Sequence, residues 1–237
     1  MKILALETSA KSVSAAVVEN GSVLASAYQH TGLTHSRTLM PLVDGMLKAA
    51  ELSLDEMGLI AVANGPGSFT GLRIGVSAAK GLAWAKELPC CGVSTLLAMA
   101  QNLRHTDATI VCAMDARRNQ VYNAVFRAEN GQLTRLTEDR AISLAQLAEE
   151  LQNEKTVKFV VGDGAKLCYN YLLEQGIPCR LAPAALMMQN ATGVALAAEE
   201  LASEGKTVSS QELACVYLRL SQAERERLAK GLKITVD

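Results

Sequence analysis

The alternation of hydrophobic and polar positions divides the first half of the chain into short strands and helices. Apolar runs over residues 2–8, 13–18 and 22–28 are typical of strands, and Asn20-Gly21 between the last two is a strong hairpin signal. A helix is predicted from about Thr38 to Leu52, with Pro41 acceptable only if it lies in the first turn. The elements predicted next are a strand over 59–63, a helix opening near Gly71, a strand over 90–93 and a helix capped by Ser94.

The second half of the chain repeats this order of elements. Strands are predicted over 109–114, 120–127 and 132–137, followed by a helix over 144–151 and a strand over 157–161 that ends at Gly162-Asp163-Gly164. A helix, a short strand near 179–181 and a helix over about 190–204 complete the repeat. Two copies of a three-strand meander followed by α-β-α-β-α are typical of the actin, sugar kinase and heat-shock ATPase (ASKHA) group. We therefore predict an α/β fold of two duplicated ribonuclease H-like lobes, over 1–105 and 106–237, whose C-terminal helices are free to pack back on the first lobe.

The segment from Gly65 to Gly75 concentrates residues that allow special backbone conformations or close approach. A glycine-rich turn at a helix N-terminus can bind anions through free N–H groups. However, Gly65, Gly67 and Gly71 are spaced one residue too widely for a dinucleotide fingerprint, and no G-K-[ST] follows for a P-loop. We favour a tight turn and close helix packing as the role of these glycines.

Composition and charge limit the function classes. The hydrophobic content of 49% over 237 residues supports two modest cores. A net charge of -1 gives no overall excess of positive charge that could bind a phosphate backbone. If RNA is bound, we expect a partner to make most of the contacts with it. Six scattered cysteines without a C-x-x-C pattern, no signal-peptide core and no membrane-length apolar run predict a cytoplasmic protein without a membrane segment. The charge alternation from Ser221 to Lys233 predicts a solvated helix.

Several segments together resemble the TsaB (YeaZ) family of bacterial tRNA threonylcarbamoyladenosine biosynthesis proteins. The segments are Leu4-Ala5-Leu6-Glu7-Thr8-Ser9, the run from Gly65 to Gly75, Gly92-Val93-Ser94-Thr95-Leu96 and Asp115-Ala116-Arg117-Arg118-Asn119-Gln120-Val121-Tyr122. The likeness is dense in the first half of the chain and thins after Tyr122. One departure is Cys215 before Val216-Tyr217-Leu218-Arg219, where the family usually carries proline. The resemblance independently implies the ASKHA fold.

We assign structural roles, in preference to catalytic ones, to the candidate site residues. Glu7-Thr8-Ser9 ends the first strand, where kinases of this architecture hold metal and phosphate, but the loop is short and lacks glycine. Asp115 and the arginines after it can stabilise a turn, to which the resemblance adds a role in lobe packing or partner contact. His30, His35 and His105 do not form the H-x-x-x-H pair that the related catalytic protein TsaD carries. We predict no catalytic residue, no metal ligand and no cofactor.

The resemblance implies a non-catalytic subunit that binds and activates TsaD, which transfers a threonylcarbamoyl group to the adenosine next to the anticodon of certain tRNAs. It further implies TsaE, an ATPase, in a larger assembly, TsaC as the source of threonylcarbamoyl-AMP, and tRNA contacted indirectly through the complex. Two alternatives are a small-molecule kinase or ATPase, which would bind nucleotide, and a glycoprotease-like hydrolase, which would need metal ligands that this sequence lacks.

Small and apolar residues on the two helices of the first lobe are the predicted partner surface. They could form half of a helical bundle with the same helices of TsaD, and pairing of like surfaces would also permit a homodimer. The predicted interface residues are Leu39, Leu42, Val43, Met46, Leu47, Gly71, Ile74, Gly75 and Ala78. Charge at Val43 or Met46 is expected to leave the chain folded but unable to bind TsaD.

Overall fold

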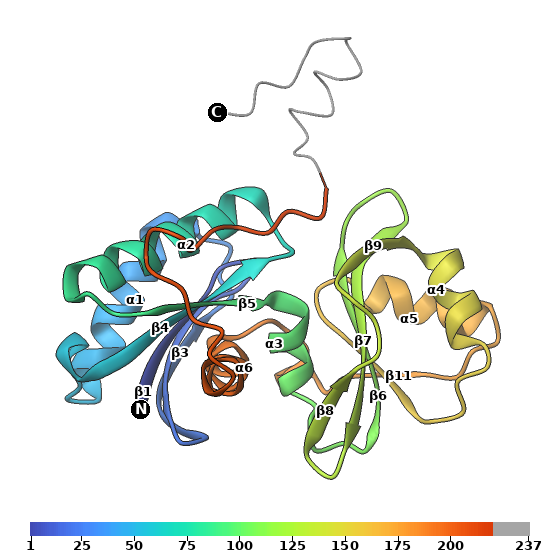
Figure 1. Ribbon diagram of the computed structural model, residues 1–237. Helices are drawn as coiled ribbons and strands as arrows, with labels where there is room; N and C mark the ends of the chain where they lie inside the picture. Colours follow the sequence, from blue (N-terminus) through green and yellow to red (C-terminus); the bar gives the residue numbers. More distant parts are fainter. Residues whose placement is uncertain (220–237) are drawn as a thin grey trace, which may run out of the picture.

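The first lobe is built on a five-stranded sheet in a computed structural model that describes residues 1–219 (Figure 1). The strand order is β3-β2-β1-β4-β5, antiparallel over the first three strands and parallel from β1 to β5. The strands are β1 (Lys2–Glu7), β2 (Val13–Glu19), β3 (Ser22–Gln29), β4 (Met57–Gly65) and β5 (Cys90–Ser94). The hairpin at Asn20-Gly21 is confirmed, since both residues adopt the positive φ that such a turn requires.

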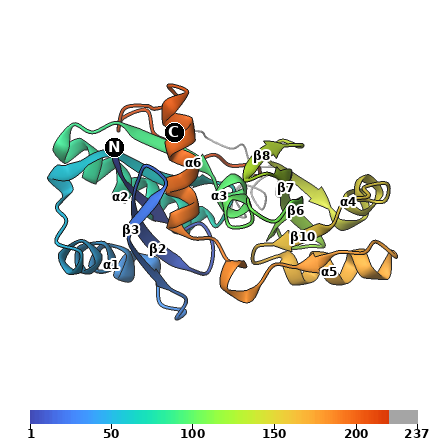
Figure 2. The ribbon, with the colours of Figure 1, turned by 90° about the horizontal axis from the view of Figure 1, so that it is seen from below.

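Helices cover both faces of this sheet. On one face, α1 (His35–Ala49) and α2 (Phe69–Lys86) pack over a core that includes Leu4, Leu6 and Val62. On the other face, α6 (Ala191–Ser203) packs over Ile3, Ala5 and other strand residues that point the opposite way. Figure 2 shows α6 lying along the first lobe although it comes from the end of the chain.

The second lobe repeats the strand order of the first. Its sheet is ordered β11-β10-β6-β7-β8, with β9 also paired to β7. The strands are β6 (Ala108–Asp115), β7 (Gln120–Glu129), β8 (Gln132–Arg135), β9 (Arg140–Ser143), β10 (Lys158–Val161) and β11 (Arg180–Leu181). Helices α4 (Leu144–Leu151) and α5 (Ala165–Glu174) cover one face, and α3 (Thr95–Gln101) covers the other. The duplicated α/β architecture predicted from the sequence is therefore confirmed.

Helix α3 joins the two lobes. Its Ala98 packs in the core of the first sheet, while Leu96 and Met99 pack in the core of the second. It also packs closely against α6, because a Cβ on Gly193 of α6 would lie 2.2 Å from the carbonyl oxygen of Ala98. The interface between the lobes is thus continuous apolar core.

Local details depart from the sequence predictions. Helix α1 begins at His35, so Pro41 falls in the second turn, where the exposed ring removes one helical hydrogen bond. Strand β9 was not predicted, and two short 3₁₀ turns at Leu54–Glu56 and Ala184–Leu186 complete the elements. The helix expected over 221–233 lies outside the described residues. All six cysteines are free, and the four at 90, 91, 112 and 168 are buried as small apolar residues.

Candidate functional site

A cleft of about 580 Å³ opens between the lobes. It lies at the carboxyl ends of parallel strands β4 and β10, the place where ligands bind in open α/β sheets. Its walls come from the turns after β1, β4, β6 and β10 and from the last described residues of the chain. The duplicated fold therefore places the predicted loops Glu7-Thr8-Ser9, Asn64-Gly65-Pro66-Gly67 and the Asp115 turn around one hollow.

The Glu7-Thr8-Ser9 loop is fully buried against the start of α2. The Thr8 hydroxyl donates to the Gly71 carbonyl at 2.7 Å, and the Ser68 N–H donates to the Ser9 carbonyl at 2.7 Å. A Cβ on Gly71 would lie 2.2 Å from the Thr8 carbonyl oxygen, and a Cβ on Gly75 would lie 2.3 Å from the Thr8 hydroxyl. The close-packing interpretation of the glycine-rich segment is confirmed.

Two of the N–H groups at the N-terminus of α2 are engaged within the chain. The Ser68 hydroxyl caps the helix by accepting a hydrogen bond from Gly71 N–H at 3.3 Å, and the N–H of Ser68 itself is taken by Ser9. A Cβ on Gly67 would lie 2.6 Å from the Ser9 carbonyl oxygen, so this glycine also serves the contact between the loops. The amides of Ser68 and Gly71 are therefore engaged within the chain and are not available to a phosphate.

Two buried carboxyl groups, one from each lobe, lie at the cleft: Asp163 lines it, and Glu7 is fully buried next to the lining residue Ser9. Burial raises the pKa of Glu7 to about 7, against a lowering by the Ser9 N–H that donates to its Oε1. Burial also raises the pKa of Asp163, which accepts a hydrogen bond from the Gln189 amide at 3.0 Å. Within residues 1–219 no three His, Cys, Asp or Glu side chains are grouped so that they could hold a metal ion.

Residues 208–219, here called the C-terminal strap, run along α2 (Figure 1). The last four of them, Val216 to Arg219, line the mouth of the cleft. Val216 N–H donates to the Asn64 carbonyl at 2.7 Å, and Arg219 donates to the Ala116 carbonyl at 2.8 Å. The strap therefore links the loop after β4 to the turn after β6. The strap also explains why residue 65 is glycine. Its φ is +142°, and a Cβ would lie 2.1 Å from the Val216 carbonyl oxygen.

An aromatic contact holds the strap to α2. The rings of Phe69 and Tyr217 lie 4.8 Å apart, and the Arg73 guanidinium stacks 3.9 Å from the Phe69 centroid while its Nε donates to the Tyr217 hydroxyl at 3.2 Å. Sequence reasoning assigned the strap no role. The only signal for it was the Val216-Tyr217-Leu218-Arg219 run noted in the family resemblance.

The turn after β6 has an unusual backbone. Arg117, Arg118 and Asn119 have φ values of 63°, 56° and 55°, three successive left-handed residues without glycine. The Asp115 carboxylate accepts the Arg117 N–H at 2.7 Å. The stabilisation of this turn by Asp115 is thus a side-chain cap on the backbone rather than an ion pair, and both arginine side chains are exposed.

The nine predicted interface residues lie together on the α1 and α2 side of the first sheet, but most are covered by their own chain. Leu47, Ile74 and Ala78 are partly exposed. The other six are buried, with exposed fractions such as 2% for Val43 and 7% for Met46. The buried residues are Leu39, Leu42, Val43, Met46, Gly71 and Gly75.

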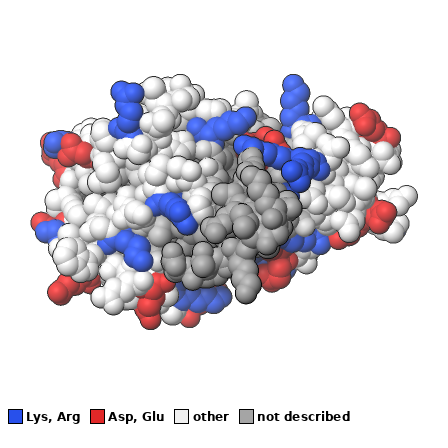
Figure 3. Space-filling view, turned by 90° about the horizontal axis from the view of Figure 1, so that it is seen from above, with Lys and Arg blue, Asp and Glu red and all other residues white. Residues whose placement is uncertain are grey.

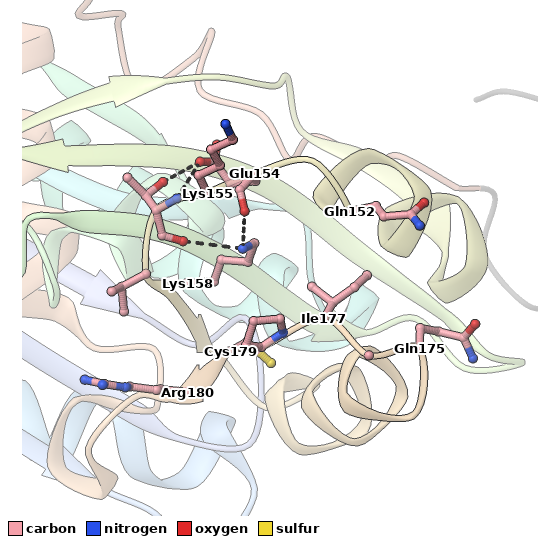
Figure 4. A pocket seen from close by; sticks show the side chains of 12 residues that line it. Gln152, Glu154, Lys155, Lys158, Gln175, Ile177, Cys179 and Arg180 are labelled. Atoms are coloured by element: carbon pink, nitrogen blue, oxygen red, sulfur yellow. Dashed lines mark hydrogen bonds between the residues drawn. The ribbon is translucent and has the colours of Figure 1, made fainter.

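A second hollow, of about 520 Å³, lies at the amino ends of β10 and β11 (Figure 4). Lys158 is only 3% exposed there, and its ammonium donates to the carbonyls of Glu154 at 2.6 Å and Thr156 at 3.4 Å. This lysine therefore holds the loop before β10 in place. Within residues 1–219 no helix is long and apolar enough to cross a membrane.

Comparison with known proteins identifies the family. A family model described as TsaD, tRNA N6-adenosine threonylcarbamoyltransferase, matches residues 29–225. The chain is 33% identical to the tRNA threonylcarbamoyladenosine biosynthesis protein TsaB of Bacillus subtilis, over 94% of this chain and 96% of that protein. It is also 33% identical to TsaB of Escherichia coli, over 92% and 95% of the two chains.

Solved structures agree in fold. YeaZ from Pseudomonas aeruginosa superposes with a TM-score of 0.77 at 28% identity, covering 92% of this chain and 99% of that one. A ROK hexokinase from Thermus thermophilus, with a TM-score of 0.50 at 14% identity over 86% of this chain and all of its own, shares the fold alone. The chain belongs to the TsaB (YeaZ) family of proteins for the biosynthesis of threonylcarbamoyladenosine in tRNA.

Proposed function

We propose that this chain is a non-catalytic subunit that binds TsaD and activates it in the formation of N6-threonylcarbamoyladenosine next to the anticodon of tRNAs. It works in the cytoplasm, and TsaE joins the larger assembly. Membership of the TsaB family supports the role in this pathway. The observation that carries the subunit role is the outer face of α1 and α2.

Two glycines inside these helices are not required by any packing contact within residues 1–219. Gly45 of α1 and Gly81 of α2 are exposed, and a Cβ on either would meet nothing within 4 Å. A glycine inside a helix costs about 0.5–1 kcal/mol relative to alanine. Because no neighbour in residues 1–219 requires the missing side chain, we infer that the backbone of a partner helix approaches here.

Large apolar side chains are also exposed on these two helices. Met40 of α1 is 42% exposed, and Trp84 of α2 is 73% exposed. Exposed aromatic and methionine side chains are typical anchors of protein interfaces. Leu47, Ile74 and Ala78 are partly exposed beside them, whereas the buried members of the predicted interface support the helices from beneath.

The match to the TsaD family model also supports pairing of like surfaces. Two chains that share a fold can join through corresponding helices, with a pseudo-two-fold axis between them. The same surface would serve a homodimer when TsaD is absent. The engagement of the Ser68 and Gly71 amides and the strap residues that line the cleft support a subunit without its own phosphoryl-transfer site.

The test combines binding with activity. The full chain and TsaD are mixed, and complex formation is followed by size-exclusion chromatography and by the fluorescence of Trp84, the single tryptophan of this chain. Modification of tRNA is then assayed with each protein alone and with both together. Met40→Glu and Gly81→Arg are expected to abolish binding and activation while circular dichroism shows a folded chain. Leu173→Glu, which changes an exposed leucine on α5 of the second lobe, is the matched control and should behave as wild type.

Two results would count against the proposal. Full activation of TsaD by folded Met40→Glu and Gly81→Arg variants would remove this face as the contact surface. Modification of tRNA by this chain in the absence of TsaD would refute its non-catalytic role.

A further inference from the structure

Cationic side chains gather at the mouth of the cleft. Lys11, Arg117 and Arg219 line it, Arg73 stacks on the cleft residue Phe69, and Arg118 follows in the same turn as Arg117. No ion pair joins any of these five to a carboxylate of residues 1–219. The net charge of -1 for the whole chain conceals this local excess of positive charge.

Elsewhere on the described surface most lysines and arginines are neutralised locally. Their ion pairs to aspartate or glutamate involve Lys2, Lys48, Lys86, Arg104, Arg127, Arg135, Arg140 and Lys206. Figure 3, which looks down on the cleft side, shows several Lys and Arg side chains standing on this face, while most Asp and Glu side chains lie toward its rim. The five cations at the cleft mouth thus have no ion-pair partner within residues 1–219, whereas more than half of the other lysines and arginines there have one.

The turn at 117–119, which carries two of these cations, has a strained backbone. Left-handed backbone is sterically disfavoured for residues other than glycine and, to a lesser degree, asparagine, and Arg117, Arg118 and Asn119 adopt it in succession. Both arginine residues of the turn are exposed. Two carboxylates line the cleft beside them: Asp115 accepts the Arg117 N–H, and Asp163 accepts a hydrogen bond from the Gln189 amide. Strain of this kind is typical of functional segments.

The cations come from both lobes and from the strap. Lys11 and Arg73 belong to the first lobe, Arg117 and Arg118 to the second, and Arg219 to the strap between them. A single small anion would contact only part of such a spread, whereas a chain of phosphates can contact cations along the whole mouth. Guanidinium groups suit this ligand because each can bind a phosphate through two parallel hydrogen bonds.

We propose that the mouth of the cleft binds the phosphate backbone of tRNA directly, through Arg117 and Arg118 with Lys11, Arg73 and Arg219. The inference rests on the proposed function, which brings tRNA to the complex, and goes beyond it by giving this subunit a direct RNA contact. Contacts of this type are independent of base sequence and weaken as salt concentration rises, because binding releases counterions from the RNA.

The experiment compares two double variants of the full chain. Arg117→Gln/Arg118→Gln removes two cations at the cleft mouth, and Lys155→Gln/Lys166→Gln removes two exposed, unpaired cations of the same lobe away from it. Affinity for unmodified tRNA is measured over a series of salt concentrations, once with the chain bound to TsaD and once with the chain alone. Binding to TsaD is measured separately for every variant.

The Arg117→Gln/Arg118→Gln variant is expected to bind tRNA about tenfold more weakly at 0.1 M salt or below, with the slope of log affinity against log salt reduced by about 2, one for each phosphate that is no longer neutralised. Binding to TsaD should be unchanged. The lysine control should match wild type, and Arg117→Lys/Arg118→Lys should recover most of the salt dependence because it restores the charges.

Each other outcome is decisive. If TsaD is bound normally but the arginine variant keeps the wild-type tRNA affinity and slope, the direct contact is refuted while the proposed function stands. If both double variants lose affinity equally, the effect is one of net charge, and the cleft mouth is not the site. If wild-type chain fails to bind TsaD, the proposed function fails, and the titration of the chain alone decides the RNA contact by the same comparison.

Discussion

The hydroxyl of Thr8 donates a hydrogen bond to the carbonyl of Gly71, so the loop after the first strand lies directly on the glycine face of α2. The backbone of the loop occupies the space that a side chain at Gly71 would need, and the Thr8 side chain does the same at Gly75. The face of α2 that carries Gly71 and Gly75 is therefore an internal contact within the first lobe.

We expect substitutions on this face to destabilise the chain. Gly71→Ala and Gly75→Leu should each lower the free energy of unfolding by about 1–3 kcal/mol, because an added side chain overpacks a contact that has no free volume. Urea denaturation followed by circular dichroism measures the change. Unchanged stability together with an inability to bind TsaD would instead make this face an intermolecular surface.

Gly45 and Gly81 should respond in the opposite direction. Gly45→Ala and Gly81→Ala are expected to stabilise the isolated chain by about 0.5–1 kcal/mol each, because alanine removes the entropic cost of a helical glycine and its Cβ meets open space. The contrast is Gly193→Ala, which should destabilise because its Cβ would meet the Ala98 carbonyl. A destabilising effect at Gly45 or Gly81 would show that the surrounding surface is not open.

Glu7 should make stability fall as pH rises. Its pKa is about 7 in the folded chain against 4.5 for an unperturbed glutamate, so the folded chain holds a proton between these values that the unfolded chain has released. The favourable contribution is complete below pH 4.5 and is lost as pH rises through about 7, where ionised Glu7 costs up to about 3 kcal/mol. Asp163, whose pKa is also raised by burial, acts in the same direction.

The Glu7→Gln variant should remove most of this dependence. Its melting temperature at pH 8 is expected to exceed that of wild type, and the difference should vanish near pH 4. Glu138→Gln, at an exposed position of the second lobe, serves as the control for the change in net charge. If Glu7→Gln and wild type have parallel pH profiles, Glu7 is ionised in the folded chain at neutral pH.

The aromatic contact should control how tightly the strap is held. Tyr217→Ala removes a ring pair of about 0.5–1.5 kcal/mol and the hydrogen bond from Arg73. We expect faster hydrogen exchange at the Val216 amide, which donates to Asn64, with little change in β1 or β6. Tyr28→Ala changes a similarly exposed tyrosine of β3 and should leave exchange at Val216 as in wild type.

Features with a local cause could be predicted from the sequence. The hairpin at Asn20-Gly21, the Ser94 cap and the repeated strand order each depend on residues close together in the chain. The start of α1 was misplaced because Pro41 was expected in the first turn, whereas the helix begins at His35 and accommodates Pro41 one turn later. Strand β9 was missed because it is only four residues long and pairs with β7, which is already paired with β6 and β8.

The candidate site depends on contacts between distant segments, and these the sequence could not reveal. The apolar stripe of α1 did not distinguish Val43, which is buried in the core, from Met40, which faces solvent. Glutamate at Val43 would consequently put an unpaired charge into the core, so it tests folding before it tests TsaD binding. The strap crosses the cleft about 150 residues after the loop it covers, with contacts such as Asn64 to Ala214 that no local pattern encodes.

The position of α6 sets an order of events during synthesis. The first lobe leaves the ribosome early, but the helix that covers one face of its sheet comes from residues 191–203. Until then Ile3, Ala5, Leu59 and their neighbours are covered on that face only in part, by α3, while α4 and α5 of the second lobe already have their sheet. The lobe that is made first is thus completed last, and the nascent chain must keep a half-covered sheet from aggregating until its final helix arrives.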